Sequence, residues 1–173
     1  MLKICIVYGS TTRYTEMVAV KIQEQPGFGN AELIDIEDIQ PEQILDFDFI
    51  IFGIPTWDYG EIQSSWQNVW DQLDVMDFTG KIVAFFGLGD QLGYSEWFVD
   101  AMGLLHDKIA ARGAAVIGEW PSEGYTFNTE KSLTANKKMF VGLPVDETNQ
   151  EDLTDARIKK WCTQLRQIIM DDG

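Results

Sequence analysis

The sequence predicts a three-layer α/β fold, in which a doubly wound parallel sheet of five strands carries helices on both faces. Short apolar segments alternate with amphipathic helical segments along most of the chain. The apolar segments are nearly continuous, as in Phe49-Ile50-Ile51-Phe52-Gly53-Ile54, which is typical of parallel strands buried on both faces. The 173 residues suit one domain spanning residues 1–173, with a sizeable core and too little chain for a second.

Five segments rich in Ile, Val and Phe and bounded by turn signals are the predicted strands: residues 3–8, 31–35, 49–54, 81–87 and 114–119. Helical periodicity predicts helices between and after them at residues 14–25, 62–73, 96–112 and 153–170, with a weaker one after Pro41. Residues 120–145 break the alternation with Gly, Pro, Asn and Thr before an apolar run resumes at 139–143. We therefore expect an insertion that splits the fifth strand.

The charge balance restricts the partners. A formal net charge of −15 argues against nucleic acid and anionic membrane surfaces, whose phosphates would be repelled. A basic protein partner is the natural complement, although a solubilising surface explains runs of acidic residues equally well. The apolar run at the N-terminus is too short to span a bilayer and leads into a turn, so we expect a cytoplasmic protein that does not bind membranes.

Few side chains are suited to catalysis or metal binding. Cys5 and Cys162 share no CxxC spacing, and Cys5 in a predicted strand is expected to be a small buried residue. The single histidine, His106, is expected at a solvated helix position. We therefore expect neither a metal site nor catalytic side chains.

The segment Gly9-Ser10-Thr11-Thr12-Arg13-Tyr14-Thr15-Glu16 links the first predicted strand to the first helix. Free backbone N–H groups, the positive end of the helix dipole and the hydroxyls of Ser10, Thr12 and Thr15 make such a turn suitable for binding phosphate. It lacks the Gly-Lys-Ser/Thr of nucleotide hydrolases, which favours a single terminal phosphate over a triphosphate. Taken alone, the segment fits an ordinary capped helix start equally well.

Two further unusual loops follow the third and fourth strands: Pro55-Thr56-Trp57-Asp58-Tyr59-Gly60-Glu61 and Gly87-Leu88-Gly89-Asp90-Gln91-Leu92-Gly93-Tyr94. In a doubly wound sheet, ligands bind beyond the carboxyl ends of the strands, where these loops and the first one should meet. Trp57 and Tyr94 are placed to hold a flat ring between them. Separately, Trp57 could cap the core and Tyr94 could pack on a helix, but three such loops at one edge favour a ligand site.

These motifs, together with Phe-Val-Gly-Leu at 140–143, resemble the flavodoxin family in its long-chain form over essentially the whole chain. Within the family the chain is most similar to the B-type (second) flavodoxins of enteric-like bacteria, through Thr12, Tyr14 and the segments 71–74 and 105–108. The resemblance implies the strand order 2-1-3-4-5 and a noncovalently bound FMN. It also implies a low-potential carrier of single electrons, which is not an enzyme.

The resemblance also implies which residues contact FMN. Residues 10–15 would hold the phosphate, the backbone of 56–60 and 88–90 would line the polar edge of the ring, and Trp57 and Tyr94 would flank the ring. The complete expected set is Ser10, Thr11, Thr12, Arg13, Tyr14, Thr15, Pro55, Thr56, Trp57, Asp58, Tyr59, Gly60, Leu88, Gly89, Asp90 and Tyr94.

Two positions depart from the family pattern. Arg13 stands where the family usually has Gly, and Tyr14 where it usually has a residue such as Asn. Because a left-handed backbone would cost arginine on the order of 1 kcal/mol, we expect Arg13 in the ordinary helical region, where it partly neutralises the phosphate or is simply solvated. By the resemblance, the Asp58-Tyr59 peptide would turn a carbonyl toward the flavin. A type II-like turn then predicts positive φ at Tyr59 and weaker stabilisation of the one-electron-reduced flavin.

As a carrier, the protein is expected to be a monomer that docks transiently onto a basic NADPH-dependent flavodoxin/ferredoxin reductase and onto acceptor redox enzymes. One alternative is an FMN-dependent NAD(P)H:quinone reductase of the same architecture. A receiver-type signalling domain is a more distant one, because Gly9-Ser10 and Pro55-Thr56 stand where its acidic residues would be needed.

Overall fold

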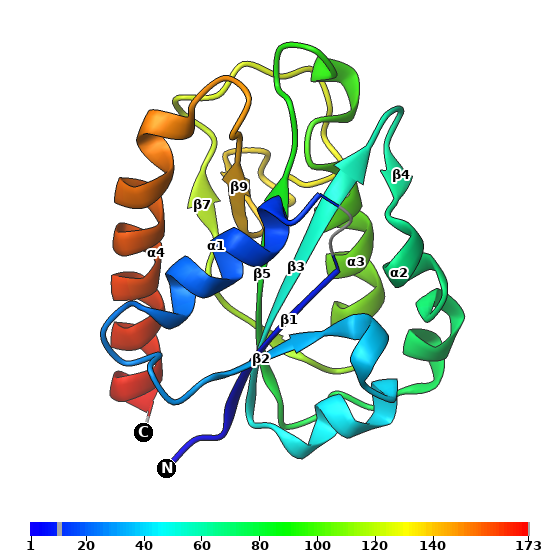
Figure 1. Cartoon of the computed structure of the whole chain (residues 1–173), viewed down its shortest axis with the longest axis vertical. Coiled ribbons are helices and arrows are strands. Elements are labelled where there is room, and N and C mark those ends of the chain that lie inside the picture. The colour runs from blue at the N-terminus through cyan, green and yellow to red at the C-terminus, as the bar shows by residue number, and fades with distance from the viewer. Residues whose placement is uncertain (10–11, 173) are drawn as a thin grey trace.

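A parallel sheet in the order β2-β1-β3-β5-β6 forms the centre of the molecule (Figure 1). The structure, a computed structural model, describes residues 1–9 and 12–172. The strands are β1 (Ile4–Tyr8), β2 (Glu32–Asp35), β3 (Phe49–Trp57), β5 (Ile82–Leu88) and β6 (Ala115–Val116), and every neighbouring pair is parallel. The predicted fold class and strand order are confirmed.

The fifth strand position is shared by two short strands, as the insertion predicts. β6 pairs with Ile82 and Val83 at the start of β5, whereas β9 (Leu143–Val145) pairs with Phe86, Gly87 and Leu88 at its end. Between them the chain forms a small antiparallel pair, β7 (Trp120–Pro121) and β8 (Met139–Phe140). β6 ends well before residue 119, where the expected strand ended.

Helices cover both faces of the sheet. α1 (Tyr14–Gln23) and α4 (Glu151–Asp172) pack together on one side, and α2 (Ser64–Gln67), η3 (Trp70–Val75) and α3 (Asp100–Ala110) lie on the other (Figure 1). Short 3-10 helices lie in the connections between these elements: η1 (Ile36–Asp38) and η2 (Pro41–Asp46) between β2 and β3, and η4 (Ser95–Trp97) between β5 and α3. No helix in the described part of the chain is long and apolar enough to cross a membrane.

Two predicted helices are shorter than expected, because tertiary contacts override their periodicity. The segment 62–73 begins with β4 (Glu61–Ile62), which pairs with β3, and Val69 leaves the helical region between α2 and η3. The segment 96–112 becomes regular only at Asp100, because Val99 has a left-handed backbone with φ of 50°. Phe98 and Val99 are fully buried, so packing places them where the helix would otherwise continue.

The core fills the space between the sheet and its helices. Phe52 on β3 stacks on Phe85 of β5, with ring centroids 5.6 Å apart, and it also contacts Trp66 and Phe78. Cys5 is fully buried in β1, as expected, and Cys162 is buried in α4. Burial raises the pKa of the Cys5 thiol well above its usual range and that of Cys162 to about 12, so both remain unreactive thiols.

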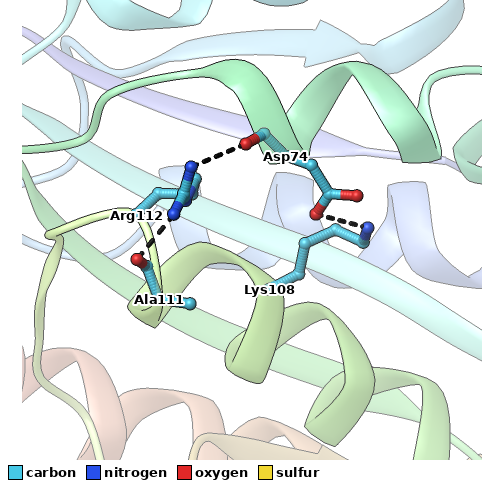
Figure 2. Close-up of polar contacts among 4 residues, drawn as sticks. All are labelled: Asp74, Lys108, Ala111 and Arg112. Atoms are coloured by element: carbon cyan, nitrogen blue, oxygen red, sulfur yellow. Dashed lines mark hydrogen bonds and ion pairs between the residues drawn. The ribbon is translucent and has the colours of Figure 1, made fainter.

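Polar contacts fix α3 against η3 (Figure 2). Lys108 Nζ donates to Asp74 Oδ1 at 2.7 Å, and Arg112 Nη1 donates to the Asp74 carbonyl at 2.8 Å. The Lys108 ammonium also lies 4.9 Å from the centroid of the Trp70 ring. These contacts hold the end of α3 that is remote from the loops at the carboxyl edge of the sheet.

His106, also on α3, is not at the solvated position that we expected. Its side chain is only 20% exposed, and its ring meets the buried Phe85 ring edge-on at 5.5 Å. Its outer edge faces solvent, where Nδ1 lies 3.0 Å from Asp107 Oδ1. The imidazole therefore serves mainly as a packing group beside the sheet.

Candidate functional site

A cleft of about 530 Å³ opens at the carboxyl ends of β1, β3 and β5. The loops that follow β3 and β5 reach the upper end of the molecule in Figure 1, and the carboxyl edge of a doubly wound sheet is where ligands bind. The cleft is lined by Thr12, Tyr14, Thr15, Pro55, Thr56, Trp57, Asp58, Leu88, Gly89, Asp90, Tyr94, Trp97, Phe98, Glu147 and Thr148. The three loops singled out in the sequence thus meet in one place.

The cleft does not include every residue expected there. Arg13, Tyr59 and Gly60 do not line it, and Ser10 and Thr11 lie outside the described residues. Four lining residues were missed: Trp97, Phe98, Glu147 and Thr148. Glu147 and Thr148 follow β9, which takes the outer half of the fifth strand. Applying the carboxyl-end rule to that split strand would have found them.

The first loop enters α1 through a strained residue. Arg13, which precedes α1, has φ of 69° and ψ of −2°, and its carbonyl accepts the N–H of Met17 at 2.9 Å. The expectation of an ordinary helical backbone at Arg13 is wrong. The chain must turn sharply from β1 into α1, and a left-handed residue achieves this even without glycine. The Arg13 side chain is exposed and lies along α1 with Glu16 and Met17.

Gly9 lets this loop pass close to buried side chains. A Cβ atom at Gly9 would lie 2.6 Å from Gln63 Oε1 and 2.8 Å from Trp66 Cδ1. Both neighbours are buried, and the Trp66 indole N–H donates to the Gly53 carbonyl at 3.0 Å. Only glycine therefore fits at the start of the loop without displacing this support.

The second loop is a hairpin between β3 and β4. Thr56 pairs with Ile62 and Trp57 with Glu61, which leaves Asp58, Tyr59 and Gly60 as the turn. Positive φ falls on Asp58, at 40°, and on Gly60, at 87°, not on Tyr59. The predicted turn geometry at Tyr59 is therefore wrong. The turn places its left-handed positions on glycine and aspartate, which tolerate them better than an aromatic residue does.

Aromatic side chains surround the mouth of the cleft. Trp57 and Tyr94 both line it, and Tyr94 is 39% exposed. Tyr59 at the tip of the hairpin is 67% exposed, and its ring packs edge-on against Trp97 and Tyr94, with centroids 4.9 and 6.4 Å apart. The cleft therefore has aromatic walls next to an aromatic outer rim.

The third loop is held by a buried carboxylate. Asp146 is fully buried, and its Oδ2 accepts hydrogen bonds from the backbone N–H of Gln91 at 3.1 Å and from the Gln91 amide at 2.8 Å. Its Oδ1 accepts the backbone N–H groups of Thr148 and Asn149 at 3.1 and 3.0 Å. Asp146 thus joins the loop after β5 to the loop after β9, and both loops line the cleft.

Asp90 lies beside this junction. Its Oδ1 accepts hydrogen bonds from Gly93 N at 2.7 Å, from Leu92 N at 3.2 Å and from the Asn149 amide at 2.7 Å. Partial burial raises the pKa of Asp90, but the hydrogen bonds outweigh it and hold the pKa below its usual value. Asp90 therefore carries a negative charge at the cleft at neutral pH.

The arrangement suits a ligand with an anionic end and a flat ring. The N-terminus of α1, with the hydroxyls of Thr12 and Thr15, supplies hydrogen-bond donors and a positive dipole end. Trp57 and Tyr94 supply aromatic faces, and the loops at Gly89 and Asp58 supply backbone polar groups. Fold and cleft together define the class: a doubly wound α/β protein whose cleft at the carboxyl edge of the sheet suits a phosphorylated ring compound.

Comparison with known proteins gives the family. The flavodoxin family model matches residues 6–161. The chain is 52% identical over 160 residues to flavodoxin 2 of Escherichia coli, covering 92% of each chain, and 47% identical over 169 residues to the flavodoxin of Synechococcus elongatus, covering 96% and 97%. The structure of Fusobacterium nucleatum flavodoxin bound to flavin mononucleotide matches with a TM-score of 0.88 at 32% identity, covering 96% of this chain and 98% of that one. The chain belongs to the flavodoxin family.

Proposed function

We propose that the protein binds one FMN noncovalently in the cleft and carries single electrons at low potential from a reductase to acceptor enzymes. Flavodoxins are electron carriers, and the observation that carries the proposal here is the meeting of the α1 N-terminus with two aromatic walls in one cleft. When bound, FMN supplies the one-electron chemistry, and the protein supplies binding and electrostatics. Residues 1–173 act as one FMN-binding unit.

The phosphate is assigned to the loop between β1 and α1. Thr12, Tyr14 and Thr15 line the cleft at this end, and Ser10 and Thr11 belong to the same loop. Thr15, in the first turn of α1, lines the cleft although it is almost fully buried. Arg13 does not line the cleft, but it adds a positive charge near the same helix end, which favours a dianion there.

The ring is assigned to the two other loops. Trp57 and Tyr94 flank it, the backbone of Asp58 and of 88–90 meets its polar edge, and Pro55, Thr56, Trp97 and Phe98 complete the walls. The aromatic side chains exclude water that would otherwise stabilise a reduced, anionic ring. Negative charges add to this effect: one unit charge at about 10 Å and an effective dielectric near 20 disfavours the anion by about 1.7 kcal/mol, or about 70 mV. Asp58, Asp90 and Glu147 line the cleft and act in this direction.

Redox partners follow from the carrier role. The net charge of −15 and the carboxylates of Asp58, Asp90 and Glu147 at the cleft suit a basic NADPH-dependent flavodoxin/ferredoxin reductase and basic faces on acceptor enzymes. The complexes are transient, and the carrier is a monomer in the cytoplasm. Reduction by the reductase should then slow as ionic strength rises.

Flavin binding and turnover test the proposal. Apoprotein titrated with FMN should quench the flavin fluorescence at a 1:1 ratio, and riboflavin should bind more weakly because it lacks the phosphate. The holoprotein should not oxidise NAD(P)H with quinone unless a reductase is added. Steady turnover without a reductase would favour the quinone reductase, an alternative not favoured by relatives that are named flavodoxins at 47 and 52% identity.

A further inference from the structure

A carboxylate with one free oxygen lies beneath the flavin-site hairpin. Asp100, the first residue of α3, is 1% exposed, and its Oδ1 accepts a hydrogen bond of 2.6 Å from the Thr129 hydroxyl. Its Oδ2 has no hydrogen-bond partner in the described part of the chain, and the Lys131 ammonium is 4.0 Å from it. A buried oxygen without a hydrogen bond is costly, so its presence calls for an explanation.

The free oxygen faces the turn of the hairpin. A Cβ atom at Gly60 would lie 3.5 Å from Asp100 Oδ2 and 3.0 Å from Trp97 Cδ1. The next residue of α3, Ala101, donates its backbone N–H to Thr56 Oγ1 at 3.0 Å. Ala101 therefore hydrogen-bonds the strand of the hairpin, and the Asp100 carboxylate lies next to its turn.

The insertion contacts the same end of α3 from the other side. Besides Thr129 and Lys131, the Ser132 hydroxyl is buried and donates to the carbonyl of Val99. The chain also passes tightly over α3 at Gly103, where a Cβ atom would collide with the Lys131 carbonyl. Asp100 thus lies between residues 129–132 of the insertion and the hairpin that lines the cleft.

We infer that Asp100 is a positioning residue through which the insertion acts on the flavin-binding hairpin, and that its charge weakens the binding of reduced flavin relative to oxidised FMN. The inference rests on the proposed FMN-carrier function. The hairpin contributes Thr56, Trp57 and Asp58 to the cleft, so a charge directly beneath it acts on whatever ring the cleft holds. Reduction adds negative charge to the ring, and a nearby carboxylate opposes this.

The electrostatic surroundings decide when Asp100 is charged. Burial raises the pKa of Asp100, whereas the Thr129 hydrogen bond and the Lys131 ammonium oppose this rise. The charged side chains on the hairpin, on η4 and beside Thr129 in the insertion are exposed: Asp58, Glu61, Glu96 and Glu130. Thr129 and Lys131, both in the insertion, are therefore the groups that adjust the charge on Asp100.

Asp100→Asn tests the inference, because it removes the charge and keeps the shape and an acceptor for Thr129. The dissociation constants of oxidised and of fully reduced FMN are measured for wild type and variant from pH 5 to 9. A unit charge within about 12 Å at an effective dielectric near 20 changes an equilibrium by on the order of tenfold. The measured quantity is the dissociation constant of reduced FMN divided by that of oxidised FMN. At neutral pH we expect this ratio to be about tenfold lower in D100N than in wild type. Asp107→Asn, an exposed carboxylate on the same helix, is the control and should leave this ratio within about twofold.

Thr129→Val tests the link to the insertion without removing a charge. Losing the hydroxyl should raise the pKa of Asp100, so the pH dependence of the affinity ratio should move to higher pH. In the D100N background, T129V should leave that pH dependence unchanged. An equal ratio in wild type and D100N, an equal change in D107N, or the same T129V shift with and without Asp100 would each overturn the inference.

Different results would refute the proposed FMN-carrier function and the role of Asp100. If neither wild type nor variants bind FMN, the proposed function fails. If all bind FMN with the same ratio of affinities and the same pH dependence, the carrier function stands and the role of Asp100 is refuted.

Discussion

The side-chain amide of Asn149 donates a hydrogen bond of 2.7 Å to Oδ1 of Asp90, which lines the cleft. The same nitrogen lies 2.9 Å from Asp146 Oδ2, so one amide group joins two carboxylates. Asn149 follows β9 and Asp90 follows β5, which means that this contact ties the insertion side of the sheet to the predicted ring-binding loop. The loop is therefore held in place before any ligand arrives.

Removal of this amide should weaken FMN binding. Asn149→Ala leaves Asp90 and Asp146 without a shared donor, and losing hydrogen bonds to charged groups costs on the order of 1.5–3 kcal/mol. We expect the dissociation constant for FMN to rise at least tenfold in a fluorescence titration. Asn30→Ala, at an exposed position remote from the cleft, is the matched control. Unchanged affinity in N149A would show that the junction does not support the site.

The backbone and the charge of Arg13 can be separated by two variants. Arg13→Gly and Arg13→Ala both remove the positive charge, but only glycine relieves the left-handed backbone at φ of 69°. In urea denaturation, the free energy of unfolding of the glycine variant should be about 1 kcal/mol higher than that of the alanine variant. Both variants should lose affinity for FMN and keep their affinity for riboflavin. Equal losses for the two ligands would refute a role for Arg13 at the phosphate.

Gly9→Ala should damage the phosphate loop. The added methyl group would lie 2.6 Å from Gln63 Oε1 and 2.8 Å from Trp66 Cδ1, and both neighbours are buried. Overpacking of this kind costs about 1–3 kcal/mol, so the thermal midpoint should fall and FMN affinity should fall with it. Gly29→Ala is a suitable control, because its Cβ would meet no atom within 4 Å. A G9A protein as stable as G29A would contradict the close approach.

Asp100 also gives the apoprotein a characteristic dependence on pH. Because burial raises its pKa above the ordinary value of 3.8, the folded state binds this proton more tightly than the unfolded state. Asp100 therefore destabilises the folded state least below pH 3.8. This destabilisation grows as the pH rises through the pKa of Asp100 in the folded state. Asp100→Asn should be more stable than wild type at pH 7, and the difference should shrink toward pH 4. Denaturation at both pH values measures it, and a difference that grows on acidification would contradict the assignment.

The fold and the place of the cleft could be predicted because they depend on local patterns in the sequence. The apolar run at 49–54 can only be buried on both faces, and the carboxyl-end rule then placed the three loops at one cleft edge. Other features depend on contacts between distant segments. Trp97 and Phe98 enter the cleft because Val99 turns into α3, and Glu147 does so because β9 pairs with the end of β5. The backbone prediction was wrong at Arg13 because the sharp turn from β1 into α1 uses a left-handed residue there despite its propensity. It was wrong at Tyr59 because the hairpin places its positive φ values on Asp58 and Gly60 instead.

A redox titration of the purified protein, followed by its visible absorbance, tests one-electron transfer by bound FMN most directly. We expect a yellow protein with one FMN per chain that is reduced in two separate one-electron steps, the second at low potential. Replacement of Trp57 and Tyr94 by leucine should raise the second potential, because water then reaches the ring. A protein without bound flavin that also fails to bind added FMN, or one reduced in a single two-electron step, would contradict the account.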